Sequence, residues 1–195
     1  SDAAFYDVMD ITTTPVIASH SSARHFVPGF ERNMDDKMLA RMAENDGVIQ
    51  LNIGSAFISV ASSDSGRARS TALTAYVEAN DIAADSEAYN VAKAKIDAEH
   101  PYVYATMDDV LDHIDHIVAV AGINHVGIGS DFDGVGDSLP MGFKDVSQYP
   151  AFIDGLISRG YSEKAIEQIL GGNLMRVWRA NEAHALALRL AAQAN

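Results

Sequence analysis

The sequence predicts an α/β fold with parallel strands, because three short apolar runs alternate with segments of helical pattern. One run, residues 125–130, is followed at once by Asp131-Phe132-Asp133-Gly134. A carboxylate and a glycine turn after an apolar run are typical of a buried parallel strand that ends at an active site. Another run, residues 15–19, ends in the same way on His20. Two strand ends therefore offer an imidazole and a carboxylate, which are the side chains that enzymes use for metal-assisted hydrolysis.

The N-terminal third has the pattern of one strand–loop–helix–strand unit. Residues 1–11 carry apolar side chains at helical spacing and lead into the strand at 15–19. A loop follows, and then a helix over 34–42, for which Asn33 is the expected cap. Residues 48–53 predict the next strand.

The remainder of the chain is mostly helical in pattern. Residues 61–102 are rich in Ala, Glu, Asp and Lys, and we expect them to form a helical insertion. The insertion should begin with a loop at 62–66, continue as two helical pieces, and lie over the rest of the fold. A helix over 106–121 precedes the strand at 125, with apolar side chains along one face. Further helices are expected at 146–159 and 162–170, followed by a long final helix capped by Asn173.

Three strands are too few for a complete (β/α)₈ barrel, which needs eight. The pattern instead predicts the C-terminal part of a TIM-type barrel. At 195 residues with 48% hydrophobic content, the chain can bury a sizeable core as a single domain, 1–195.

Composition excludes several classes of function. The formal net charge of −13 disfavours nucleic acid and anionic membranes as partners. Because the chain has no cysteine, any zinc must take His and carboxylate ligands. No apolar run approaches the roughly 20 residues that span a bilayer, and the compartment stays open between bacterial periplasm and cytoplasm. Phosphate-binding glycine loops and the Gly-x-Ser-x-Gly elbow are absent from the sequence.

Three residues are candidates for chemistry on their own pattern. His20 is flanked by serines whose hydroxyls could orient the ring, as ligand histidines require. An acid such as Asp131 at the end of a buried strand is costly unless it is paired, metal-bound or catalytic. Arg32, in the loop after the first strand, could hold a substrate carboxylate near a metal.

The other histidines are expected to be structural. His113 and His116 lie three residues apart on the predicted helix 106–121, without the i,i+4 spacing of a zincin pair. We therefore expect both side chains on a solvated face of this helix. Four more have no partner in the sequence: His25, His100, His125 and His184.

The chain also resembles the membrane (renal) dipeptidase family of zinc metallopeptidases. The resemblance rests on motifs in the same order as in the family, at residues 15–23, 32–36, 112–117, 120–122, 126–134, 145–150 and 173–177. Residues 61–98 carry no family motif. The resemblance implies a bacterial-type member and the C-terminal portion of a (β/α)₈ barrel of the metal-dependent hydrolase kind.

This resemblance also implies a function and a site. The family's activity is the hydrolysis of dipeptides with two zinc ions bridged by a carboxylate. By motif, His20 would be a zinc ligand, Asp131 the general acid/base and Arg32 the group that holds the substrate carboxylate. Phe57 would lie near the substrate. Most zinc ligands of the family precede the segment that this chain resembles, so we expect it to need the upstream part of the same enzyme, to be inactive alone, and to form a homodimer as family members often do.

Two other functions stay open on the sequence. One is a barrel-derived binding module without catalysis. The other is a different metal-dependent amidohydrolase that acts on a cyclic amide or lactone and uses a lysine or carboxylated-lysine bridge.

Overall fold

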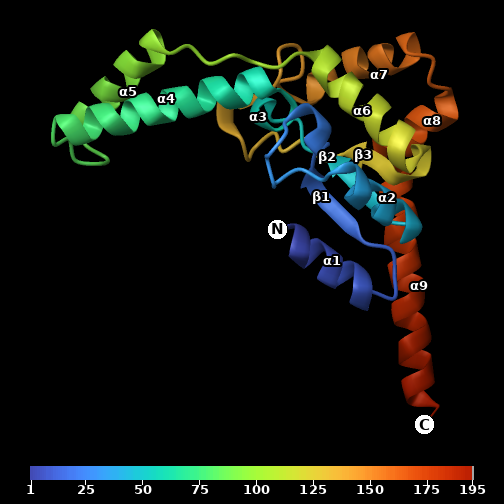
Figure 1. The fold of residues 1–195 in the computed structure, drawn as a ribbon. Coiled ribbons are helices and arrows are strands. Elements are labelled where there is room, and N and C mark those ends of the chain that lie inside the picture. Colours follow the sequence, from blue (N-terminus) through green and yellow to red (C-terminus); the bar gives the residue numbers. More distant parts are fainter. Residues whose placement is uncertain (195) are drawn as a thin grey trace.

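A three-stranded parallel sheet forms the centre of the molecule, in a computed structural model that describes residues 1–194. Its strands are β1 (Ile17–Ser21), β2 (Val48–Leu51) and β3 (Val126–Ile128), in the order β1-β2-β3 (Figure 1). Because both pairs are parallel, all three carboxyl ends lie at one edge of the sheet, which we call the carboxyl edge. The predicted α/β class with parallel strands is confirmed.

Helices α1 (Asp2–Ile11) and α2 (Asp36–Glu44) flank β1 in the chain, with a short 3₁₀ turn at Arg24–Phe26 after the strand. The prediction that Asn33 caps α2 is wrong: the Asp35 side chain accepts the cap hydrogen bond from the Met38 amide at 2.8 Å. A bridge between Ala23 and Met34 keeps the chain extended up to that point. The Asn33 amide instead donates to the Phe57 carbonyl at 2.7 Å.

Helices α3 (Ser55–Ile58), α4 (Val60–Ala79) and α5 (Glu87–Glu99) follow β2, and the last two project to one side of the sheet (Figure 1). The two predicted helical pieces are present, but the loop expected at 62–66 is wrong. The Ser59 side chain caps α4 and starts it before the serine-rich stretch. An Arg69–Asp97 ion pair joins α4 to α5. The position of these helices over a complete barrel stays a prediction.

Helix α6 (Met107–Ala121) precedes β3 and starts with a capping box formed by Thr106 and Asp109. After β3 come α7 (Tyr149–Ser158), α8 (Glu163–Glu167), a wider helical turn at Gln168–Gly172 and α9 (Asn173–Gln193). Short 3₁₀ turns lie before β3, at Ile123–His125, and after it, at Gly136–Ser138 and Val146–Gln148. Helix α9 starts at Asn173 as predicted, but the Asn173 side chain does not cap it. That amide donates to the carbonyls of Ile123 and Val126 at 2.7 and 2.8 Å and ties α9 to β3.

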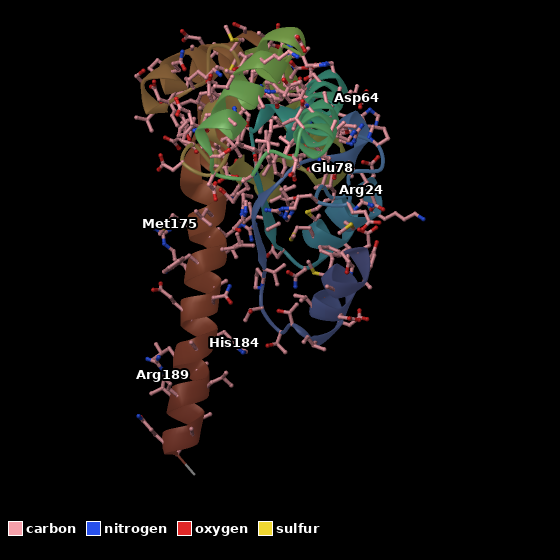
Figure 2. The ribbon with its side chains drawn as sticks, turned by 90° about the vertical axis from the view of Figure 1, so that its left-hand side faces the viewer. Arg24, Asp64, Glu78, Met175, His184 and Arg189 are labelled. Atoms are coloured by element: carbon pink, nitrogen blue, oxygen red, sulfur yellow. The ribbon has the colours of Figure 1, made fainter. Side chains whose placement is uncertain are left out.

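The hydrophobic core lies between the sheet and helices α2 and α6. Ile49 of β2, Leu39 of α2 and Ile114 of α6 are all fully buried in one cluster. Helix α9 runs past the sheet, and its C-terminal half, with Arg189, projects beyond the rest of the molecule (Figure 2). Within residues 1–194, none of the helices has the length and apolar character needed to cross a membrane.

Candidate active site

The end of β1 is irregular where it presents His20. The register with β2 shifts between Ala18 and Ser21. Successive side chains of a regular strand point to opposite faces, yet the Ser19 hydroxyl lies 2.8 Å from Nδ1 of His20. In the tautomer that donates from Nδ1 to this hydroxyl, Nε2 keeps a lone pair for a metal.

Asn52 connects the ends of all three strands. It follows β2 directly and is fully buried. Its backbone amide donates to the carbonyl of Ser21 at 2.9 Å, and its carbonyl accepts from the Ser22 hydroxyl at 2.8 Å. Its side-chain Nδ2 donates to Oδ2 of Asp131 at 2.9 Å. The Asp131 carboxylate is therefore held from β2 at the same edge of the sheet as His20.

The Asp131 side chain folds back over its own turn. Its φ of 61° is left-handed, and its carbonyl accepts from the Gly134 amide at 3.0 Å. A Cβ at Gly134 would lie 2.0 Å from Oδ1 of Asp131. Glycine is thus required at position 134 for the carboxylate to take this position.

Another glycine brings β1 and β3 close across the face of β2. A Cβ at Gly129 would lie 2.3 Å from the Ser19 carbonyl oxygen. The chain before Asp131 and the chain before His20 therefore approach each other, although β1 and β3 share no hydrogen-bonded pair in the described sheet. His20 and Asp131 lie at one edge, and within residues 1–194 no hydrogen bond or ion pair joins their side chains directly.

Arg32 and Phe57 are brought together by the structure. The Arg32 guanidinium lies 5.9 Å from the centre of the Phe57 ring. The Arg32 carbonyl accepts from the Ser21 hydroxyl at 3.0 Å, which places this loop beside the end of β1. The Phe30 ring packs edge-on against Phe57 at 5.3 Å. The exposed guanidinium is available to a carboxylate ligand.

His113 is part of the support of this edge, and the prediction of a solvated position for it is wrong. The ring is fully buried. Its Nδ1 accepts from the Ala23 amide at 3.2 Å, so Nε2 carries the proton and donates to the Ile58 carbonyl at 3.1 Å. Burial lowers the pKa of His113 from 6.5 to about 4. The neutral ring therefore links α6 to the loop after β1 and to α3.

The predicted residues at the carboxyl edge include one candidate zinc ligand. His20 offers one imidazole nitrogen, whereas a catalytic zinc site has three protein ligands. This donor fits a part of a zinc centre and does not complete one.

Asn52 and Gly129 support the candidate site, and the sequence reasoning missed both. Asn52 carried a usable signal, because it is a polar residue directly after a buried strand. No local pattern indicates that Asn52 pairs with Asp131, which is 79 positions away in the sequence.

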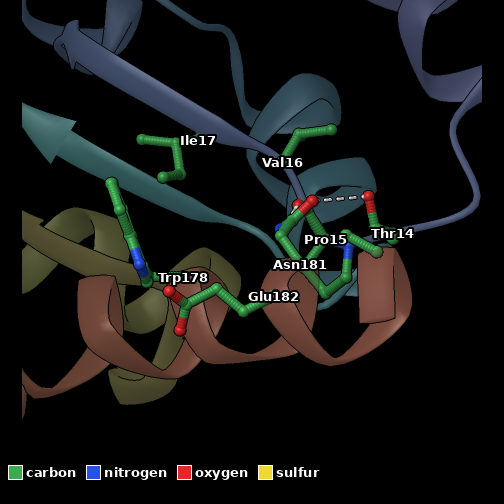
Figure 3. A pocket seen from close by; sticks show the side chains of 8 residues that line it. Thr14, Pro15, Val16, Ile17, Trp178, Asn181 and Glu182 are labelled. Carbon is green, nitrogen blue, oxygen red and sulfur yellow. Dashed lines mark hydrogen bonds between the residues drawn. The ribbon is translucent and has the colours of Figure 1, made fainter. Parts of the chain in front are cut away.

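A cavity of about 540 Å³ lies at the opposite end of β1, between the start of the strand and α9. Figure 3 shows Thr14 and Pro15 beside Asn181 there and Trp178 nearer to Ile17, with the Thr14 hydroxyl donating to Asn181 at 2.8 Å. This cavity is far along the strand from His20 and takes no part in the candidate site.

Comparisons with known proteins show which sequences this chain resembles. The family model described as "Membrane dipeptidase (Peptidase family M19)" matches residues 1–192. A protein of Schizosaccharomyces pombe named as an uncharacterized dipeptidase is 36% identical over 189 residues, which are 96% of this chain and 36% of that protein. The chain spans about a third of the length of the curated relatives that it matches first.

Solved structures give the same result. A metallopeptidase from Rhodobacter sphaeroides, liganded with a phosphinate mimic of the dipeptide L-Ala-D-Ala, superposes with a TM-score of 0.65 at 25% identity, over 90% of this chain and 39% of that one. An amidohydrolase from Pseudomonas aeruginosa has a TM-score of 0.61 at 18% identity, over 89% and 48% of the two chains, which is a likeness of fold alone.

Proposed function

Because the chain belongs to the membrane dipeptidase family, peptidase family M19, we propose that it is part of a zinc-dependent dipeptidase that hydrolyses the peptide bond of dipeptides. The dipeptide mimic bound to the Rhodobacter sphaeroides relative supports this substrate class. The observation that carries the proposal is the hydrogen bond by which Asn52 holds the Asp131 carboxylate at the edge where β1 presents His20.

The proposal places the three strands in a (β/α)₈ barrel, with 1–195 as one domain and α4 and α5 over the barrel. The likeness to structures of which this chain covers 39% and 48% supports this arrangement. The partner of this chain is then the upstream part of the same enzyme, which carries the remaining zinc ligands. Alone, the chain is expected to be inactive. A homodimer is the expected assembly, which ultracentrifugation of the enzyme tests.

His20 would hold zinc through Nε2, oriented by the Ser19 hydroxyl. Bound zinc supplies a Lewis acid for the peptide carbonyl and a water activated as a nucleophile at neutral pH. Asp131 takes a proton from the attacking water and delivers it to the leaving amine nitrogen. The guanidinium of Arg32 binds the C-terminal carboxylate of the substrate, and the Phe57 ring beside it packs against the substrate.

The decisive experiment is a dipeptide hydrolysis assay of the zinc-loaded enzyme that contains this chain together with its upstream part. Asp131→Asn should lower kcat by roughly 10²–10⁴-fold at unchanged zinc content. Asp133→Asn, an exposed neighbour, is the matched control and should keep activity. Full activity in Asp131→Asn would contradict the assignment of the proton carrier. A wild-type protein without hydrolysis would favour the non-catalytic binding module instead.

A further inference from the structure

Three potential metal ligands meet at a place that the proposed active site does not use. They are His25 of the 3₁₀ turn after β1, Asp36 at the first residue of α2, and His116 of α6. One ligand atom of each lies within 4.8 Å of the others. The three residues come from separate elements, so their meeting is a property of the tertiary fold.

The two imidazoles lie close to each other and to the carboxylate. His25 and His116 are stacked, with centroids 4.3 Å apart and planes 20° from parallel. Nε2 of His116 lies 2.7 Å from Oδ1 of Asp36. Because the lone pair of an imidazole nitrogen lies in the plane of its ring, His25 must turn out of the stack to share an ion with His116.

We propose that His25, Asp36 and His116 bind a divalent transition-metal ion such as zinc, at a site separate from the carboxyl edge. Two imidazoles and one carboxylate are a common zinc donor set, with metal–ligand distances of about 2.0–2.2 Å. Ligand atoms of one such ion lie within about 4 Å of one another, so a rotation of the exposed His25 side chain brings the three ligands together. A water completes the coordination.

The surroundings hold one ligand firmly and leave access for an ion. The His116 side chain is only 17% exposed, and the Phe26 ring packs against it at 5.6 Å and against His113 at 4.3 Å. A cavity of about 410 Å³ opens beside His25 and Asp36. The nearby Arg24 guanidinium is engaged by Asp2 at 2.6 and 2.8 Å, so its charge is compensated there.

A metal at this site would cross-link the loop between β1 and α2 to α6. That loop carries Arg32. The site therefore controls the mobility of the segment that presents the guanidinium. The inference of metal binding holds whether or not the chain is part of a dipeptidase.

The test is a titration of the metal-free 195-residue chain with Co²⁺, followed by visible absorption, and with Zn²⁺, followed by calorimetry. We expect one ion per chain. His25→Asn, Asp36→Asn and His116→Asn should each weaken binding by at least ~10-fold, with folding checked by circular dichroism. His25→Asn is the key variant, because the side chain is exposed and its removal leaves the buried core unchanged.

Two control variants separate this site from others. Glu31→Gln removes a charge from the same loop and should leave binding unchanged. His20→Asn should also leave it unchanged. Absence of binding, or binding that is lost in His20→Asn and kept in His25→Asn, would overturn the inference, and the second result would place the ion at the carboxyl edge.

Hydrogen exchange gives an independent readout of the cross-link. Zinc should slow exchange of the amides over residues 24–35 in the wild type and not in His25→Asn. Equal exchange with and without zinc in the wild type would contradict the cross-link.

Discussion

Asn52 donates to Asp131 across a gap of 79 positions in the sequence, with Nδ2 2.9 Å from Oδ2. The same asparagine side chain accepts from the Gly54 amide at 2.8 Å through Oδ1. One buried amide thus fixes both a turn of the backbone and the carboxylate that we assign to proton transfer. It is a positioning residue for Asp131.

Asn52→Asp should change the pH dependence of catalysis. The new carboxylate can still accept from Gly54, but it no longer donates to Asp131 and it brings a like charge beside it. In the enzyme that contains this chain, the acid limb of kcat should move to higher pH by about one unit or more. A purely structural role for Asn52 predicts an equal loss of kcat at every pH. Asn52→Leu serves as the comparison, and it should cost about 1–3 kcal/mol of stability because the Gly54 amide loses its acceptor.

Arg32→Met should raise KM for dipeptides by about 10-fold or more and leave kcat and the melting temperature nearly unchanged. The guanidinium is exposed and lies beside Phe57, so its removal leaves no buried charge. A dipeptide amide, which has no C-terminal carboxylate, should be hydrolysed equally by wild type and variant. A similar rise in KM for the amide would show that Arg32 acts elsewhere than on the carboxylate.

Gly127→Ala within β3 and Gly129→Ala directly after it form a matched pair. The Cβ at position 129 would meet the backbone oxygen of Ser19 at 2.3 Å, whereas the Cβ at 127 would meet the end of the Gln50 side chain at 2.6 Å. Backbone cannot move aside as a side chain can, so Gly129→Ala should cost about 1–3 kcal/mol and Gly127→Ala clearly less. Urea denaturation of the two variants measures the difference, and equal costs would contradict the close approach of β1 and β3.

Burial of His113 makes stability depend on pH. Because the folded pKa of His113 is about 4 and the ordinary value is 6.5, the unfolded chain takes up the proton first as pH falls. The contribution is fully present above pH 6.5 and is lost between there and pH 4, and the loss of stability reaches roughly 2 kcal/mol at pH 5. Urea denaturation at pH 7 and pH 5 should show this loss in the wild type and not in His113→Gln. The exposed His100→Gln variant is the control and should keep the wild-type slope.

Strands and most helices could be predicted because their signals are local. Residues 125–130 are apolar and end at a glycine turn, and the apolar face of 106–121 repeats at helical spacing. Caps were harder to predict, since Asn33 and Asp35 are both good cap residues. The bridge between Ala23 and Met34 keeps the chain extended as far as residue 34, so the helix begins only after Asp35, and Asp35 is its cap.

The candidate site could be predicted only in part, for the same reason. His20, Arg32, Phe57 and Asp131 were found from strand ends and motifs, and their roles stay predictions. The partners Asn52 of Asp131 and Asp36 of His116 come from elements 79 and 80 positions away. The sequence pattern of a single helix or strand cannot indicate contacts between residues so far apart in the chain.

The bulged strand β1 has one further consequence. Within the described residues, it is hydrogen-bonded to β2 on one side only, and Ile17 is 38% exposed there. Unpaired strand margins of this kind recruit strands from other molecules. The solubility of the isolated polypeptide at high concentration therefore depends on this margin, and a lysine in place of Ile17 should delay aggregation without touching the carboxyl edge.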